Sequence, residues 1–135
     1  MVEVVNRQRR VKIATGSWEV LGGRIVEAIQ RSGASATVAF VSDSKIRQLN
    51  RQFRGVDKAT DVLSFPEDDN GDNLGDIAIS VDTAARQAEE SGLTFDAEVA
   101  QLLLHGFLHL AGYDHETDNG EMNRLELRLR KKLGI

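Results

Sequence analysis

L-L-H-G-F-L-H-L-A-G-Y-D-H-E, residues Leu103–Glu116, is the segment from which the fold and the chemistry of this chain can be worked out. Its first part is the end of the longest apolar helix that the sequence predicts. This helix starts at Thr94 or Asp96 and stops at Gly112. His105 and His109 are four residues apart, so one helix face carries both imidazoles, one turn apart. A glycine three residues after His109 would let the chain turn back, and His115 could then approach the same point.

The three histidines of the chain all lie in this short window, and the chain has no cysteine. A transition metal would therefore rest on His105, His109 and His115, which leaves the fourth tetrahedral position open for water, as in a catalytic zinc site. Unrelated histidines are the alternative, but their clustering argues against it. Zinc is the metal expected first, and nickel, copper or iron would also suit imidazole. Asp114 and Glu116 would either accept hydrogen bonds from the imidazoles or only solvate the turn.

The spacing H-x-x-x-H-x-x-G-x-x-H is also that of metzincin proteases, which carry a glutamate general base directly after the first histidine. Gly106 stands at that position here and cannot accept a proton. A metal-bound water can still reach a pKa of ~7 without such a base. A metallohydrolase acting on peptides or small molecules therefore stays an alternative, and chelator-sensitive cleavage of casein would support it.

The remaining pattern predicts an α+β domain with about four strands over residues 1–135. Strands are expected at Met1–Asn6, Ala36–Val41, Val62–Phe65 and Ile77–Val81, with a solvated loop at Glu67–Asp76. Further helices are expected from an N-cap at Ser17 to Arg31, from Ser42–Ser44 to Gly55, at Thr83–Ser91 with Asp82 as its cap, and from about Asp118 to Leu133.

The charge balance is 17 basic against 21 acidic side chains, a net charge of −4. This excludes a general basic coat for nucleic acid but leaves room for a local basic groove. The N-terminal residues do not form a signal peptide, and no apolar run approaches the ~20 residues that span a bilayer. We therefore expect a cytoplasmic protein without a membrane partner.

A positive patch is predicted in Lys45–Lys58, which holds five basic side chains against the single Asp57. Arg47 and Arg51 are expected to be solvated on the surface of a helix. Arg54 ends the predicted helix just before Gly55, where a guanidinium can bind a phosphate and offset the charge that develops in phosphoryl transfer. Thr60 and Ser64, in the following T-D-V-L-S-F segment, would either donate to the same phosphate or only cap and turn the chain.

Three blocks of this sequence resemble the YbeY endoribonucleases, a family of bacterial rRNA-maturation factors. H-G-F-L-H-L-A-G-Y-D-H (His105–His115) is similar to the family's histidine signature, Asn50–Phe65 to its second block, and Leu74–Ser80 to its third. Met122 and Glu126 fall where the family has a Met and a Glu. Ala59 departs from the proline that many members carry before Thr-Asp, which removes some loop rigidity and leaves the site assignment unchanged.

The resemblance implies a zincin-like α+β fold and a zinc-dependent, single-strand-specific endoribonuclease that forms the 3′ end of 16S rRNA and serves ribosome quality control. It implies that His105, His109 and His115 hold one Zn²⁺ and that Arg54 and His105 take part in activity. The expected partners are single-stranded RNA or the 16S rRNA precursor and ribosomal small-subunit proteins or assembly factors, and not DNA. A non-catalytic assembly factor with a structural zinc is the second alternative.

Two points of mechanism stay open from sequence, since either water or the RNA 2′-OH can be the nucleophile and the zinc can be catalytic or structural.

Aromatic stacking platforms are typical of proteins that bind single strands. The candidates near the site are Phe53, Phe65 and Tyr113, and we expect core packing for both phenylalanines. The sequence therefore indicates no stacking platform, and we predict weak affinity for naked RNA.

Overall fold

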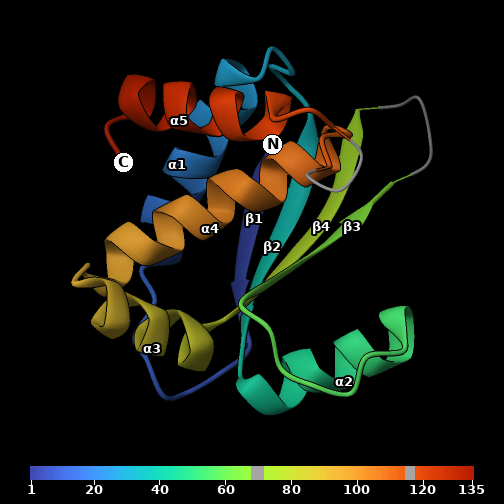
Figure 1. The fold of residues 1–135 in the computed structure, drawn as a ribbon, viewed down its shortest axis with the longest axis vertical. Helices are drawn as coiled ribbons and strands as arrows, with labels where there is room; N and C mark the ends of the chain where they lie inside the picture. The colour runs from blue at the N-terminus through green and yellow to red at the C-terminus, as the bar shows by residue number, and fades with distance from the viewer. Residues whose placement is uncertain (68–71, 115–117) are drawn as a thin grey trace.

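A four-stranded sheet with helices on both faces forms the body of the computed structural model, which describes residues 1–67, 72–114 and 118–135 (Figure 1). The strands are β1 (Val2–Asn6), β2 (Ser35–Val41), β3 (Val62–Pro66) and β4 (Asn73–Ser80). The helices are α1 (Thr15–Ala28), α2 (Asp43–Arg54), α3 (Val81–Ser91), α4 (Phe95–Leu110) and α5 (Glu121–Leu133). Within the described ranges, none of the helices combines the length and the apolar character that crossing a bilayer requires.

The strand order is β1-β2-β4-β3, with the first three strands parallel and β3 antiparallel at the edge. Ser64 of β3 lies opposite Ile77, and Pro66 lies opposite Gly75. The predicted α+β class with about four strands is confirmed. The predicted loop up to Asp76 is wrong at its end, because Asn73, Gly75 and Asp76 already pair with β2. Gly75 and Asp76 also pair with β3, and this pairing overrides the polar composition of the segment.

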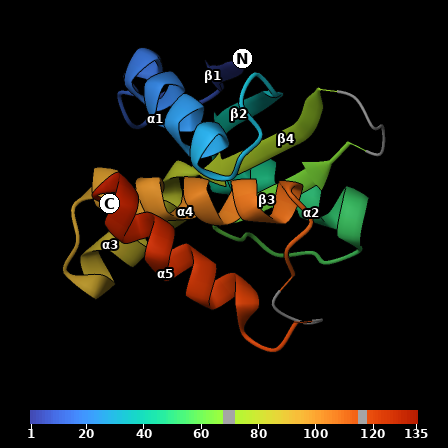
Figure 2. The same ribbon diagram turned by 90° about the horizontal axis from the view of Figure 1, so that it is seen from above.

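The two faces of the sheet are covered by different helices (Figure 2). Ile77 and Ile79 of β4 face the main core, to which α1, α4 and α5 contribute. Ala78, between them, faces the smaller cluster that includes Ile46 of α2 and Leu63 of β3. This alternation is the period of two expected of a strand covered on both sides. The edge strand β3 therefore lies between α4 on one face and α2 on the other.

Helix ends follow local side-chain chemistry, and two predicted starts are wrong. Thr94 caps α4 as predicted, since its hydroxyl accepts a hydrogen bond from the Ala97 N–H at 3.0 Å. The first helix begins at Thr15 without a side-chain cap, so Ser17 lies inside it. The third begins at Val81 with Ser80 as its cap, because the Asp82 carboxylate instead accepts the Asp43 N–H at 2.8 Å.

Asp43, in the first turn of α2, connects this helix to α3. Its carboxylate accepts hydrogen bonds from the Ser80 and Thr83 hydroxyls, both at 2.6 Å, and pairs with Arg86 at 2.9 Å. Burial alone would raise the pKa of Asp43, but the two hydroxyls and the guanidinium together outweigh burial and lower that pKa. The contact fixes α2, and with it Arg54, relative to the rest of the fold.

Candidate active site

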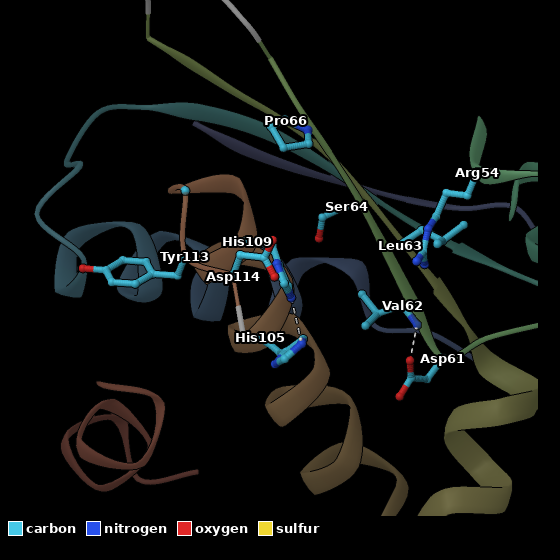
Figure 3. A pocket seen from close by; sticks show the side chains of 11 residues that line it. Arg54, Asp61, Val62, Leu63, Ser64, Pro66, His105, His109, Tyr113 and Asp114 are labelled. Carbon is cyan, nitrogen blue, oxygen red and sulfur yellow. Dashed lines mark hydrogen bonds between the residues drawn. The ribbon is translucent and has the colours of Figure 1, made fainter. Parts of the chain in front are cut away.

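The histidine pair lies near the C-terminal end of α4. The Nε2 atoms of His105 and His109 are 3.1 Å apart, and their rings meet edge to face with centroids 4.6 Å apart. Figure 3 shows both imidazoles projecting from the helix into one cavity. The predicted common face is therefore observed. His115, the third predicted ligand, lies outside the described residues, as does Glu116.

Glu126 of α5 orients His105 from behind. One carboxylate oxygen lies 3.3 Å from Nδ1 of His105, and the side chains are 15% and 28% exposed, respectively. The hydrogen bond to Glu126 raises the pKa of His105 against the lowering effect of burial, and the charges of Glu126 and Asp61 add to the increase. A carboxylate at Nδ1 keeps the proton on that nitrogen and leaves Nε2 facing His109.

Glu126 has a position in the family pattern, but no role was predicted for it from sequence. The signal that would have found it is its spacing from Met122, which is four residues earlier and fully buried. Two residues at this spacing share one helix face. This spacing indicates that residue 126 lies on the side of α5 that packs inward, although this was not predicted from sequence.

The cavity has a volume of about 580 Å³ and collects side chains from α2, β3, α4 and the turn after α4 (Figure 3). It is lined by Arg54, Asp61, Val62, Leu63, Ser64, Pro66, His105, His109, Gly112, Tyr113 and Asp114. The structure thus brings Arg54, from one side, into the same cavity as His105 and His109, although these residues are about 50 positions apart in the chain. Their catalytic roles stay predictions.

Arg54 reaches the cavity because α2 ends there. Gly55 follows in the left-handed conformation, with φ of 70°, which glycine adopts without steric cost. The buried Asn50 donates from its side-chain amide to the Lys58 carbonyl at 2.9 Å and so holds the chain segment after the helix. Arg54 is exposed, while Arg47 on the same helix pairs with Asp57 at 2.8 Å.

The polar residues around β3 hold the backbone as well as line the cavity. Ser64 donates its hydroxyl proton to the Gly106 carbonyl at 3.1 Å, which attaches the edge strand to α4. Asp61 lines the cavity and accepts the Val62 N–H at 2.7 Å. Thr60 donates to Asp61 at 3.4 Å and is not among the lining residues in the described part of the chain. Asp61 is a site residue that the sequence analysis missed, although it lies in the T-D-V-L-S-F segment.

Asp114 and Tyr113 line the cavity from the turn after α4. In Figure 3 the Tyr113 ring points away from the histidine pair. Asp114 lines the same cavity as the histidine pair. Its predicted supporting role stays a prediction.

Gly106, where a protease would carry its glutamate, faces the sheet. A Cβ atom at this position would lie 3.1 Å from two carbons of Ile77. A side chain here would start against the core and not in the cavity. The close approach of α4 to β4 explains the glycine and removes the position from which a protease base would act.

The distance between the two imidazole nitrogens shows whether the histidine pair fits a metal ion. Two imidazole nitrogens bound to one tetrahedral zinc at 2.0–2.1 Å would be about 3.3 Å apart. The observed 3.1 Å between the Nε2 atoms fits this separation, and the carboxylate behind His105 is the partner that metal-bound imidazoles commonly have. Within residues 1–67, 72–114 and 118–135, no three histidine or carboxylate side chains are grouped to hold a metal.

Comparison with known proteins supports one family. The family described as Endoribonuclease YbeY matches residues 3–134. Proteins named Endoribonuclease YbeY include one from Nautilia profundicola, 58% identical over 94 residues that cover 69% of this chain and 68% of that protein. Another, from Desulforamulus reducens, is 40% identical over 149 aligned positions, covering 99% of this chain and 97% of that protein.

The fold comparison agrees. The solution structure of the protein TM1509 from Thermotoga maritima superposes with a TM-score of 0.68 at 30% identity, covering 98% of this chain and 89% of that one. The matched region includes the histidine segment, the α2–β3 segment and β4. The chain belongs to the YbeY endoribonuclease family.

Proposed function

We propose that this protein is a zinc-dependent endoribonuclease that cleaves single-stranded RNA and acts in the cytoplasm on the precursor of the 16S rRNA 3′ end. That it is a hydrolase acting on RNA follows from its family. The observation that carries the finer proposal is the pair of Nε2 atoms 3.1 Å apart, which shares one cavity with Arg54.

His105 and His109 would hold the zinc ion, and His115, outside the described residues, is the proposed third ligand. When bound, zinc would supply Lewis acidity toward a phosphate oxygen or a water molecule. Glu126 would keep His105 in the tautomer that a metal requires. The fit of the donor pair supports this assignment.

Arg54 would bind the scissile phosphate and stabilise the charge on its oxygens. A guanidinium offers two parallel N–H donors to a phosphate, and Arg54 presents them to the cavity from the end of α2. Asp61 lines the same cavity, and its negative charge would limit how deep a phosphate can enter. A water or the RNA 2′-OH would attack, and a product with a 2′,3′-cyclic phosphate would identify the 2′-OH.

The charge distribution supports a local RNA contact. The chain has a net charge of −4, yet α2 carries exposed arginines beside the cavity. A small basic contact surface gives low affinity for naked RNA. The ribosomal small subunit or its assembly factors would then bring the precursor to this site.

The test combines metal analysis with cleavage assays on single-stranded and duplex RNA. We expect zinc in the wild type, preferential cleavage of single strands, loss of zinc and activity in His109→Ala, and loss of activity with retained zinc in Arg54→Ala. Arg9→Ala, which changes an exposed arginine outside the cavity lining, is the matched control and should stay active. Full activity of metal-free His109→Ala protein would contradict the proposal.

The cellular role has its own measurement. Cells that carry only Arg54→Ala should accumulate 16S rRNA with unprocessed 3′ ends. Normal 3′ ends in those cells would instead favour a binding role in ribosome assembly.

A further inference from the structure

An aromatic pair lies on the surface where α2 meets β3. The ring centroids of Phe53 and Phe65 are 5.2 Å apart with an interplanar angle of 65°, an edge-to-face contact. Phe65 is half-buried against the small cluster under α2, but the side chain of Phe53 is 60% exposed. The expected core role is therefore wrong for Phe53, which presents most of its ring to solvent.

The pair adjoins, in sequence, residues that line the cavity, although neither phenylalanine is among the lining residues of the described chain. Phe53 directly precedes Arg54, and Phe65 lies in β3 between Ser64 and Pro66, and all three of these neighbours line the cavity. Because side chains alternate along a strand, Phe65 faces α2 while Ser64 faces α4. The aromatic pair and the histidine pair thus flank the same edge strand from its two faces.

The surroundings of Phe53 are positively charged. Arg51 and Arg54 are both exposed on the same helical turn as Phe53. An exposed ring on a helix end that also exposes two arginines suits a ligand that combines a flat apolar face with a negatively charged backbone. An RNA nucleotide has this chemistry.

We propose that Phe53, supported edge-on by Phe65, is a stacking platform for one unpaired nucleobase of the RNA substrate, adjacent to the phosphate held by Arg54. This rests on the proposed function, in which Arg54 binds the scissile phosphate. A base in a duplex is already stacked on its neighbours and cannot offer its face, so this platform gives the single-strand preference a physical origin. Phe53 is accordingly a positioning residue.

The proposal is tested by combining a protein change with a substrate change. Single-stranded RNA is made with one abasic nucleotide, placed in turn at each position around the cleavage site, and kcat/KM is measured for wild type and Phe53→Leu. For wild type, an abasic nucleotide at one of these positions should lower kcat/KM by about 5-fold to 150-fold, which corresponds to the loss of one stacked base. At that position, the abasic substrate should cause no further loss in Phe53→Leu.

Binding and rescue give independent readouts. 2-Aminopurine at the same position should lose fluorescence on binding to wild type and Phe53→Tyr but not to Phe53→Leu. Leu127→Ala, which changes another exposed apolar side chain (52% exposed, on α5), is the matched control and should behave as wild type. Thermal unfolding checks that Phe53→Leu remains folded.

The outcomes separate the two proposals. If wild type cleaves RNA with the expected zinc and Arg54 dependence but abasic penalties are the same in wild type and Phe53→Leu at every position, only the stacking platform is refuted. If wild type neither binds nor cleaves single-stranded RNA, the proposed function fails and the platform with it.

Discussion

Replacing Glu126 by alanine should weaken zinc binding without unfolding the protein. The change removes the acceptor of the His105 Nδ1–H, so the imidazole can rotate and change tautomer. Partners of this kind contribute about 10-fold to 100-fold in metal affinity. The 3.3 Å contact is longer than a charge-assisted hydrogen bond of about 2.8 Å, and His105 is 28% exposed, so the lower part of this range applies. We expect a loss of about 10-fold to 30-fold, or roughly 1.4–2 kcal/mol.

The loss should depend on pH in a defined direction. Glu126 raises the pKa of His105, so in wild type the protonated imidazole persists to higher pH and competes with a metal. Removing Glu126 lowers that pKa and therefore weakens proton competition. The difference between wild type and variant should be full at about pH 8, above the ordinary histidine pKa, and smaller at about pH 6.

The assay is competition for zinc with a chromophoric chelator at both pH values. Glu126→Gln keeps an oxygen acceptor and should lose less affinity than Glu126→Ala, while Glu90→Gln on the exposed face of α3 should lose none. A folded Glu126→Ala protein that binds zinc within twofold of wild type at about pH 8 would refute the reasoning.

Three further predictions concern stability. Gly75→Ala should destabilise the protein by at least about 3 kcal/mol in urea unfolding, because φ of Gly75 is 126° and the new Cβ would overlap the Phe65 carbonyl oxygen. A loss of stability under about 1 kcal/mol would contradict this prediction. Asp43→Asn should cost roughly 1–2 kcal/mol at neutral pH. Because the pKa of Asp43 is lowered in the folded protein, the stability difference between wild type and Asp43→Asn should be constant above the unfolded pKa of about 3.9 and should shrink as the pH falls below it. A difference that stays the same at low pH in urea unfolding would contradict the role of this hydrogen-bond network. Gly106→Glu should lower stability by roughly 2 kcal/mol or more in thermal unfolding, because it places a carboxylate against the sheet. A variant as stable as wild type would show that a side chain at position 106 can avoid the core.

Local patterns predicted most of the fold because they reflect burial. The strand at Ala36–Val41 and the caps at Ser42 and Thr94 were predicted from neighbours in sequence and are observed. The strand β4 starts earlier than predicted because Asn73 and Asp76 become strand residues only through pairing with β2. Such long-range pairing leaves no trace in local composition.

Site residues could be predicted from sequence where their spacing along one helix places them together. They were missed where the contact depends on how two helices pack. His105 and His109 follow from a separation of four residues, whereas the approach of Glu126 depends on how α5 packs against α4. The exposure of Phe53 was mispredicted for a related reason. An apolar residue on a short helix has the same pattern whether it faces the core or the edge of the sheet.

The carboxylate behind His105 comes from the last helix of the described fold, whereas every residue that lines the cavity precedes it in the chain. Translation proceeds from the N-terminus, so a nascent chain contains the strands, α2 and α4 before α5 has been made. Such a chain would carry the histidine pair without the group that orients it. The order of synthesis therefore brings this carboxylate to the histidine pair last, because α5 must be made and docked before Glu126 can contact His105.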